Sequence, residues 1–368
     1  MTFLDLFAGV GGFRRGMELA GHKCIGFCEW DKFARMSYIS MHCITEDQRK
    51  YLATLDMKNR QKEILKDEYL NGEWCSTDIR SVNAGNIPKA DCWCFGAPCQ
   101  DFSLAGERKG LDGDRSSLIR EVFRILDELE EEDKPEWLIY ENVKGMLSSN
   151  RGFDYLSILC ELDRWGYDTE WQIFNSKDYG VPQNRERVYT VGHFRKRGIR
   201  KIFPVEATNG ENPVRIAQIG YDGSRERRNP DTFRVYDVGG VSPTLTTMER
   251  GNCEPHIPII LGGVAKTLTA TDYKQPLKVA LPTKIVSKTE DGIYVEIYPG
   301  VTVFARWSEK HNAYVAIRKL TPRECFRLQG WSDEYFERAQ SVNSDSQLYK
   351  QAGNGVTVNV VQAIAERL

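Results

Sequence analysis

A cysteine follows a short apolar run in the first third of the chain. Ala90–Phe95 is apolar enough to form a buried strand, and Gly-Ala-Pro then leads directly to Cys99. Open α/β sheets place their active sites at the carboxyl ends of strands, so a thiol here could act as a nucleophile. For a single cysteine, a small apolar side chain at a tight turn is the plainer interpretation.

Two other kinds of reactive group are expected at the same edge. Glu141 ends the apolar run Trp137–Glu141, which would bring a carboxyl group beside the thiol. Gln183–Arg187 begins another strand, with Arg185 and Arg187 at alternate positions. A thiol, an acid and two guanidinium groups at one edge would be an improbable coincidence, so together they predict an active site.

A glycine-rich turn near the N-terminus predicts a ligand site. Asp5–Gly12 has the pattern of a strand that runs through a glycine turn into a helix, which lets a ligand approach the backbone closely. The turn lacks the G-x-G-x-x-G spacing of dinucleotide folds, so a ligand without a pyrophosphate is favoured. Glu29 ends the next strand, where a carboxylate can hold ribose hydroxyls, and Trp30 could stack on adenine. Together these residues indicate a nucleoside ligand.

The elements that would position these groups alternate along the first half of the chain. Short apolar runs are followed by helix-length amphipathic stretches, which is typical of an α/β protein with a parallel sheet. A charged stretch with a helical pattern, Lys50–Leu70, is expected to pack on the outside as an insertion. The expected strands are Phe3–Phe7, Cys24–Cys28, Cys92–Phe95, Trp137–Glu141 and Arg187–Val191, and the clearest helices are Phe13–Ala20 and Ser117–Glu131.

The composition changes about half-way along the chain. Gly, Pro, Thr and Val become more frequent, and short β-like runs separated by turn signals predict a second, mostly β region. We expect a first domain of residues 1–194, completed by a C-terminal helix within 350–368, and a second domain of residues 195–349. Gly239–Thr247 and Gly262–Ala270 resemble each other, and are interpreted equally well as two recognition loops or two similar hairpins.

Composition excludes several classes of protein. Of 368 residues, 41% are hydrophobic and 28% charged, as in globular proteins, and no apolar run approaches the roughly 20 residues of a membrane helix. The N-terminus lacks the basic leader of a signal peptide. The ten cysteines form no CxxC pairs, which argues against a disulfide framework or a metal site and favours a reducing compartment. We expect a monomeric cytoplasmic protein with no metal and no membrane partner.

Charge is unevenly distributed although the net charge is only −2. Residues 195–320 contain 20 Lys and Arg against 13 Asp and Glu, a charge of +7, so the remainder has 30 against 39, or −9. A basic region on an acidic body is expected for a polyanionic partner, and it is explained about as well by an ordinary solvated surface.

In their order along the chain, these motifs resemble those of the DNA cytosine carbon-5 methyltransferases of bacterial or phage type. The resemblance implies a Rossmann-like S-adenosylmethionine-dependent methyltransferase domain with a smaller, mostly β target-recognition domain. Its motifs span nearly the whole chain; the most specific are Pro-Cys-Gln, Glu-Asn-Val and Gln-x-Arg-x-Arg. The full set is DLFAGVGGF, Glu29-Trp30, Thr77-Asp78-Ile79, GAPCQDFS, ENVKG, QNRER, RKLTPRECFRLQG (Arg318–Gly330) and GNGVTVNV (Gly353–Val360).

The resemblance implies a role for each reactive group. Cys99 would add as a thiolate to carbon 6 of cytosine, which makes carbon 5 nucleophilic. Glu141 would contact N3 and the exocyclic amine, and Arg187 would bind the base carbonyl, with Arg185 supporting the site.

The implied cofactor is S-adenosyl-L-methionine, converted to S-adenosyl-L-homocysteine. A threonine precedes Asp78 where glycine is more usual in the family, but this departure does not touch the reacting atoms. The implied cofactor residues are Phe7, Gly9, Gly11 and Gly12 at the methionine end, Glu29 at the ribose, Trp30, Asp78 and Ile79 around the adenine, Pro98 at the turn before the thiol, and Asn354 closing the methionine pocket.

The implied partner is double-stranded DNA, from which the target cytosine must be flipped because its carbon 6 is inaccessible in a stacked duplex. For any single arginine, contact with a phosphate or with solvent is a simpler explanation than reading a base. The residues suggested for DNA contact are Gln100, Ser103 and Arg115 after the thiol, and Arg225, Arg227, Arg228, Arg234, Thr244 and Thr246 in the basic region.

Three alternatives remain at this point. The same chemistry could act on transfer RNA, although such relatives usually have a smaller recognition region. A DNA-binding regulator could retain the fold without catalysis, which the intact catalytic positions argue against. A nicotinamide-dependent oxidoreductase is weakened by the incomplete glycine fingerprint.

Overall fold

The computed structural model describes most of the chain. Residues 1–97, 118–208 and 313–368 are described continuously. Between them, the described residues are the strands 218–221, 234–236, 256–261, 284–289, 292–298 and 301–308.

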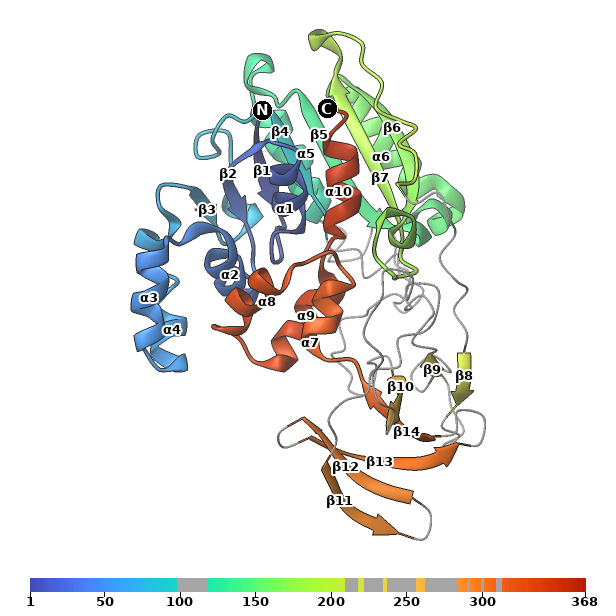
Figure 1. Cartoon of the computed structure of the whole chain (residues 1–368). Helices are drawn as coiled ribbons and strands as arrows, with labels where there is room; N and C mark the ends of the chain where they lie inside the picture. The colour runs from blue at the N-terminus through green and yellow to red at the C-terminus, as the bar shows by residue number, and fades with distance from the viewer. Residues whose placement is uncertain are drawn as a thin grey trace.

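A seven-stranded sheet forms the centre of the larger part (Figure 1). Its strand order is β3-β2-β1-β4-β5-β7-β6. The first five strands in this order run parallel to their neighbours, whereas β7 is antiparallel to both β5 and β6. The strands are β1 (Thr2–Leu6), β2 (Lys23–Cys28), β3 (Trp74–Ser76), β4 (Cys92–Phe95), β5 (Trp137–Val143), β6 (Tyr167–Asn175) and β7 (Glu186–Phe194).

The expected strands are confirmed, but the sheet is not wholly parallel. A parallel neighbour needs a long crossover, and β6 is joined to β7 by a connection that contains only the short 3₁₀ turn Ser176–Tyr179. β7 therefore runs antiparallel to β6. Two strands were missed: β3 has three residues, and β6 at the sheet edge mixes polar with apolar side chains.

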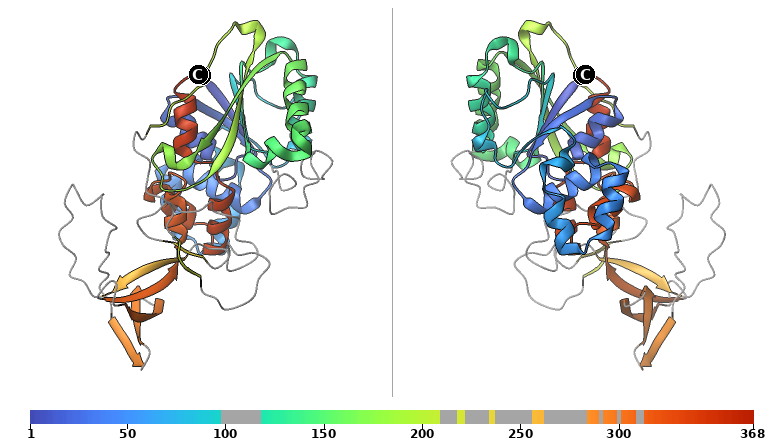
Figure 2. Two further views of the ribbon diagram at one scale, coloured as in Figure 1. Left: turned by 90° about the vertical axis from the view of Figure 1, so that its right-hand side faces the viewer. Right: turned by 90° about the vertical axis from the view of Figure 1, so that its left-hand side faces the viewer.

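Helices cover both faces of this sheet (Figure 2). On one face lie α5 (Leu118–Glu128) and α6 (Phe153–Arg164). On the other lie α1 (Gly12–Leu19) and the last helix, α10 (Val358–Ala365), which confirms the expected packing of the C-terminal helix on the first region.

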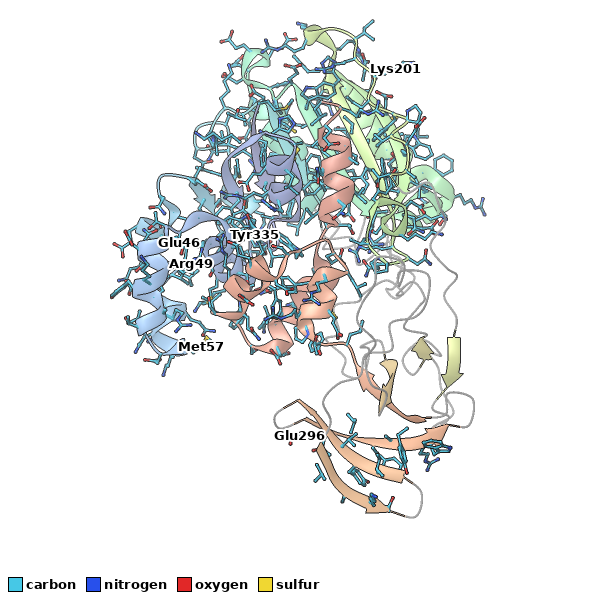
Figure 3. The ribbon with its side chains drawn as sticks, viewed as in Figure 1. Glu46, Arg49, Met57, Lys201, Glu296 and Tyr335 are labelled. Atoms are coloured by element: carbon cyan, nitrogen blue, oxygen red, sulfur yellow. The ribbon has the colours of Figure 1, made fainter. Side chains whose placement is uncertain are left out.

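The charged insertion forms two short helices at the periphery. After α2 (Lys32–Tyr38) and the π-helical turn Ile39–Cys43, the chain forms α3 (Glu46–Thr54) and α4 (Met57–Glu63). The outer position is as expected, since α4 has no buried residue and α3 has one. Figure 3 labels Glu46 and Arg49, which form an ion pair on α3, and Met57, which begins α4.

Three C-terminal helices pack against the first region. They are α7 (Pro322–Arg327), α8 (Asp333–Gln340) and α9 (Asp345–Asn354). Phe326 of α7 and Leu348 of α9 share a buried cluster with Val10 and Met41. We therefore propose a domain boundary near Leu320 rather than at residue 349; the two-domain division itself stays a prediction.

The start of the expected second domain also contacts the first region. Ile202 and Val205 lie in the same buried cluster as Phe3 of β1 and Trp137 of β5. The chain therefore leaves the first region's packing beyond Val205, later than the expected boundary at residue 195.

A second sheet forms the smaller part, which confirms the mostly β region. Its order is β11-β12-β13-β14-β10-β9-β8, and all neighbours are antiparallel except β9 and β10. Its strands are β8 (Gln218–Tyr221), β9 (Arg234–Tyr236), β10 (His256–Leu261), β11 (Lys284–Thr289), β12 (Gly292–Tyr298), β13 (Val301–Ser308) and β14 (Ala313–Lys319). None of the helices in the described part of the chain has both the length and the apolar character needed to cross a bilayer.

Candidate active site

An ion pair joins the acid and one arginine of the predicted site. Arg187 Nε lies 3.1 Å from Glu141 Oε1, and their side chains are only 16% and 12% exposed. In the antiparallel register of β5 and β7, Val143 stands opposite Arg187. Glu141 is thus a diagonal neighbour on the same face, a separation that long side chains can bridge. The prediction that these two residues meet is confirmed.

The second oxygen of Glu141 faces the end of β4. A Cβ atom at Gly96 would lie 3.3 Å from Glu141 Oε2, so this glycine leaves room beside the carboxylate. Gly96 directly follows β4, which pairs with β5 through Phe95 and Tyr140. The segment that leads toward Cys99 therefore passes the Glu141–Arg187 pair, while Cys99 itself lies outside the described residues.

Arg185 contacts the backbone of the GNGV segment. Its buried guanidinium donates from Nη1 to the carbonyl oxygen of Gly353 (3.4 Å) and from Nη2 to that of Gly355 (2.8 Å). Burial lowers the pKa of Arg185 to about 9, and the neighbouring charge of Arg187 acts in the same direction. The two carbonyls flank Asn354, an exposed residue at the end of α9. Arg185 is therefore a positioning residue for the GNGV segment.

A buried glutamine that was not expected from the sequence holds the same segment. Gln329 Nε2 donates to the carbonyl of Ala352 (3.0 Å), and Gln329 Oε1 accepts from Thr357 Oγ1 (2.9 Å). The carbonyl of Gln329 also accepts from Val358 N (3.0 Å). Gln329 lies near the end of the motif Arg318–Gly330, and a polar residue beside apolar ones there was the one sequence feature that could have pointed to it.

The predicted ribose-binding carboxylate joins the turns after β1 and β2. Glu29 Oε2 accepts from Gly9 N (2.7 Å), and Oε1 accepts from Asp31 N (2.6 Å). Burial raises the pKa of Glu29, and the two backbone donors oppose that shift. Each carboxylate oxygen has a second lone pair, so the fixed group can still accept from a ligand.

The glycines of the first turn serve different purposes. Gly9 has φ +56°, and a Cβ atom there would meet nothing within 4 Å, so it borders open space. A Cβ at Gly11 would lie 2.4 Å from His42 Nε2, and one at Gly12 would lie 2.6 Å from the carbonyl oxygen of Val356. Close packing is thus a sufficient reason for glycine at positions 11 and 12.

The adenine-side residues lie on neighbouring strand ends. Trp30 follows β2 and is 67% exposed, while Asp78 follows β3 and caps the 3₁₀ turn that begins at the buried Ile79. Arg80, not singled out from the sequence, is ion-paired to Asp78 and lies with its guanidinium carbon 5.0 Å from the centroid of the Trp30 ring. The hydrogen bond from Arg80 lowers the pKa of Asp78.

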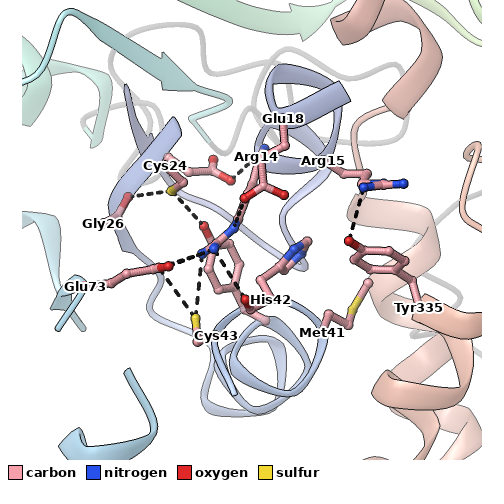
Figure 4. Close-up of polar contacts among 12 residues, drawn as sticks. Arg14, Arg15, Glu18, Cys24, Gly26, Met41, His42, Cys43, Glu73 and Tyr335 are labelled. Carbon is pink, nitrogen blue, oxygen red and sulfur yellow. Dashed lines mark hydrogen bonds and ion pairs between the residues drawn. The ribbon is translucent and has the colours of Figure 1, made fainter. Parts of the chain in front are cut away.

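A buried arginine, Arg14, follows the first turn and contacts several acidic side chains (Figure 4). Arg14 Nη1 and Nη2 contact the two carboxylate oxygens of Glu73 at 2.6 and 2.8 Å, and Nε contacts Glu18 at 2.8 Å. Its backbone N–H donates to Asp5 Oδ2 (3.2 Å). Arg14 thereby links helix α1, just after the glycine turn, to Glu73, which directly precedes β3.

Comparison with known proteins decides the family. Residues 1–368 match the family model described as C-5 cytosine-specific DNA methylase. The chain belongs to this family. It is a DNA (cytosine-5-)-methyltransferase, and the resemblance stated from the motifs is confirmed.

Relatives of this methyltransferase occur in bacteria and phages. Type II methyltransferase M.HhaI of Haemophilus parahaemolyticus is 30% identical over 368 residues, covering 99% of this chain and 93% of that protein. Type II methyltransferase M.HpaII of Haemophilus parainfluenzae is 29% identical over 373 residues, covering 100% and 88%. Orphan methyltransferase M.SPRI of Bacillus phage SPR is 26% identical over 461 residues, covering 100% and 97%.

Solved structures confirm the fold of the methyltransferase. The S. pombe Dnmt2 methyltransferase has a TM-score of 0.58 at 16% identity, covering 100% of this chain and 97% of that one. The Entamoeba histolytica methyltransferase EhMeth has a TM-score of 0.59 at 16% identity, with the same coverage. The fold is the Rossmann-like methyltransferase domain with a smaller, mostly β part, as predicted.

The remaining predicted site residues of the methyltransferase lie partly inside and partly outside the described residues. Arg234 begins β9 in the smaller sheet. Phe7 directly follows β1 and has φ +56°. The residues outside the described part are Pro98, Cys99, Gln100, Ser103, Arg115, Arg225, Arg227, Arg228, Thr244 and Thr246.

Proposed function

We propose that this enzyme methylates carbon 5 of a cytosine flipped out of double-stranded DNA, through a temporary bond between Cys99 and carbon 6. The observation that supports it most is the ion pair between Glu141 and Arg187 at the strand ends beside Gly96. An acid and a guanidinium held together at the segment leading to a cysteine match the three groups that the reaction needs.

In the proposed reaction, a group adds to the cytosine ring and is later eliminated from it. The Cys99 thiolate bonds to carbon 6, and the electron pair displaced from the carbon 5–carbon 6 bond makes carbon 5 nucleophilic. Glu141 contacts N3 and the exocyclic amine as the thiolate adds, and Arg187 stabilises charge that develops on the carbonyl oxygen. Carbon 5 uses this electron pair to take the methyl group, whose bond to the sulfur of the donor breaks with its electrons remaining on that sulfur. Carbon 5 then gives its proton to water, and the electrons of that bond restore the carbon 5–carbon 6 double bond as the Cys99 thiolate leaves carbon 6.

The residues at the ends of β1, β2 and β3 fit the methyl donor, S-adenosylmethionine. Gly9 borders open space, the Glu29 carboxylate is fixed by two backbone donors, and the Trp30 ring is exposed. When bound, the cofactor supplies an electrophilic methyl group. In the proposal Glu29 accepts from the ribose hydroxyls, Trp30 contacts the adenine, and Asp78 accepts from the adenine amine, with Phe7, Ile79 and Asn354 completing the pocket.

The smaller, mostly β part is proposed to bind the DNA. Residues 206–320 contain 15 Lys and Arg against 13 Asp and Glu, because five of the basic residues counted from residue 195 onward lie in 195–205, which packs with the first region. Individual basic side chains of this part, rather than a large net charge, would contact the phosphates. Flipping a cytosine costs a few kcal/mol of unstacking and unpairing, which contacts with the DNA backbone and in the pocket must offset.

Covalent trapping tests the proposal. The purified full chain is incubated with S-adenosylmethionine and duplex DNA containing 5-fluorocytosine, whose fluorine blocks release. We expect a protein–DNA adduct that is stable to denaturant, absent for Cys99→Ser and present for the control Cys160→Ser, since Cys160 is an exposed cysteine on α6. An adduct in Cys99→Ser, or none with the folded wild-type chain, would overturn the mechanism. Transfer RNA in a parallel methylation assay tests the substrate class.

A further inference from the structure

We propose that Arg80 competes with the adenine ring for Asp78 and Trp30, and so acts as a positioning residue that limits the affinity of the enzyme for its cofactor. This inference rests on the proposed function, which assigns those two side chains to adenine. Its basis is the set of contacts that Arg80 makes with each of them.

The first observation concerns the acceptor capacity of Asp78. Arg80 N donates to Oδ1 (3.0 Å), and Arg80 Nε contacts Oδ1 (2.9 Å) and Oδ2 (3.1 Å). Arg80 Nη2 contacts Oδ2 at 2.9 Å. A carboxylate offers about four lone-pair positions, and here all of these contacts come from one residue. An adenine amine could bond to Asp78 only if the Arg80 side chain released at least one of its hydrogen bonds to that carboxylate.

The second observation concerns the face of Trp30. The guanidinium carbon of Arg80 lies 5.0 Å from the centroid of this ring, within the range of a cation–π contact. Trp30 and Asp78 follow β2 and β3, which are neighbours in the sheet. One guanidinium therefore contacts both side chains proposed for adenine, although they are far apart in the sequence.

The third observation is the exposure of the Arg80 side chain to solvent. The side chain of Arg80 is 56% exposed and that of Asp78 is 26% exposed, and ion pairs that solvent reaches contribute little to stability. A ligand that offers Asp78 a donor and Trp30 an aromatic surface could displace the guanidinium into solvent. The 3₁₀ turn itself would remain, because Asp78 also accepts from the backbone N–H of Arg80.

Calorimetric titration with S-adenosylhomocysteine tests the inference on the full-length protein. We expect Arg80→Ala to bind S-adenosylhomocysteine about three- to tenfold more tightly than the wild type does. This range corresponds to the energy of one solvent-accessible ion pair and one cation–π contact, which the ligand would no longer have to break. The control is Arg195→Ala, which removes an exposed arginine paired with Asp163 and Asp168 at the far end of β7. Its affinity should equal that of the wild type.

A ligand without the 6-amino group separates competition from a general structural effect. Purine riboside cannot donate to Asp78, whereas adenosine can, so the gain from Arg80→Ala should be larger for adenosine. Equal gains for both ligands, or an unchanged or weaker affinity of Arg80→Ala for S-adenosylhomocysteine, would overturn the inference while leaving the proposed cofactor intact. Failure of the wild-type protein to bind S-adenosylhomocysteine would instead overturn the proposed cofactor, and this inference with it.

Discussion

Glu141 and Arg187 are paired across the one junction of the large sheet where a parallel strand meets an antiparallel one. Their atoms approach to 3.1 Å because β7 runs against β5 and sets Arg187 diagonally opposite the acid. Had β7 been parallel, as expected from the sequence, the start of that strand would lie at the opposite edge of the sheet. The reversal of β7 is therefore what brings the acid and the arginine together.

Removing the acid should abolish most of the activity. We expect Glu141→Gln to lower the methylation rate of duplex DNA by about a hundredfold or more, because an amide cannot exchange a proton at the cytosine ring. Incorporation of a labelled methyl group measures the rate. The matched control is Glu186→Gln, an exposed glutamate on β7 paired with Lys144, which should keep nearly full activity. Similar rates for both variants would contradict the role of Glu141.

Arg185 should matter for the stability of the GNGV segment. In Arg185→Met the carbonyl oxygens of Gly353 and Gly355 lose their buried donors, at a cost of about 2 kcal/mol in the free energy of unfolding. Urea denaturation gives this value, and Arg195→Met, a change at an exposed arginine, should cost far less. Equal stabilities of the two variants would show that Arg185 does not hold the segment.

Cofactor affinity should weaken in mild acid. Burial raises the pKa of Glu29, so this carboxyl gains its proton at a higher pH than an exposed glutamate does. A protonated Glu29 has fewer acceptor positions for ribose hydroxyls, and the affinity for S-adenosylhomocysteine should fall as pH is lowered from about 8 to about 5. Glu29→Gln should bind weakly with a flatter pH profile. A wild-type affinity that stays constant over this range would contradict the assignment.

Two glycines of the first turn should respond differently to alanine. Gly9→Ala meets no neighbour but must adopt φ near +56°, which costs roughly 1–2 kcal/mol, and its methyl group would enter the open space proposed for the cofactor. Gly12→Ala would press on the carbonyl of Val356, and should lower the melting temperature because helix α1 must shift. We expect Gly9→Ala to lose cofactor affinity beyond its loss of stability; thermal melts and titrations of both variants provide the comparison.

Much of the fold was predictable because it depends on local patterns. Apolar runs such as Cys92–Phe95 are enough to predict strands, and a final helix was expected within residues 350–368, where the structure has α10 at Val358–Ala365. The missed strands, Trp74–Ser76 and Tyr167–Asn175, have weak patterns because one is very short and the other is a partly exposed edge. Their place in the sheet comes from pairing with neighbours, which no local pattern contains.

The sequence by itself determined the family, the reaction class and the positions of the acid and the arginines, because each motif is a short consecutive run whose residue types suit one chemistry. Only the tertiary structure decided which of these groups meet. Arg185 contacts carbonyls 168 and 170 positions away, and Arg80 lies on Trp30 from the next strand. Such contacts depend on strand order, direction and register, which arise from packing of the whole chain.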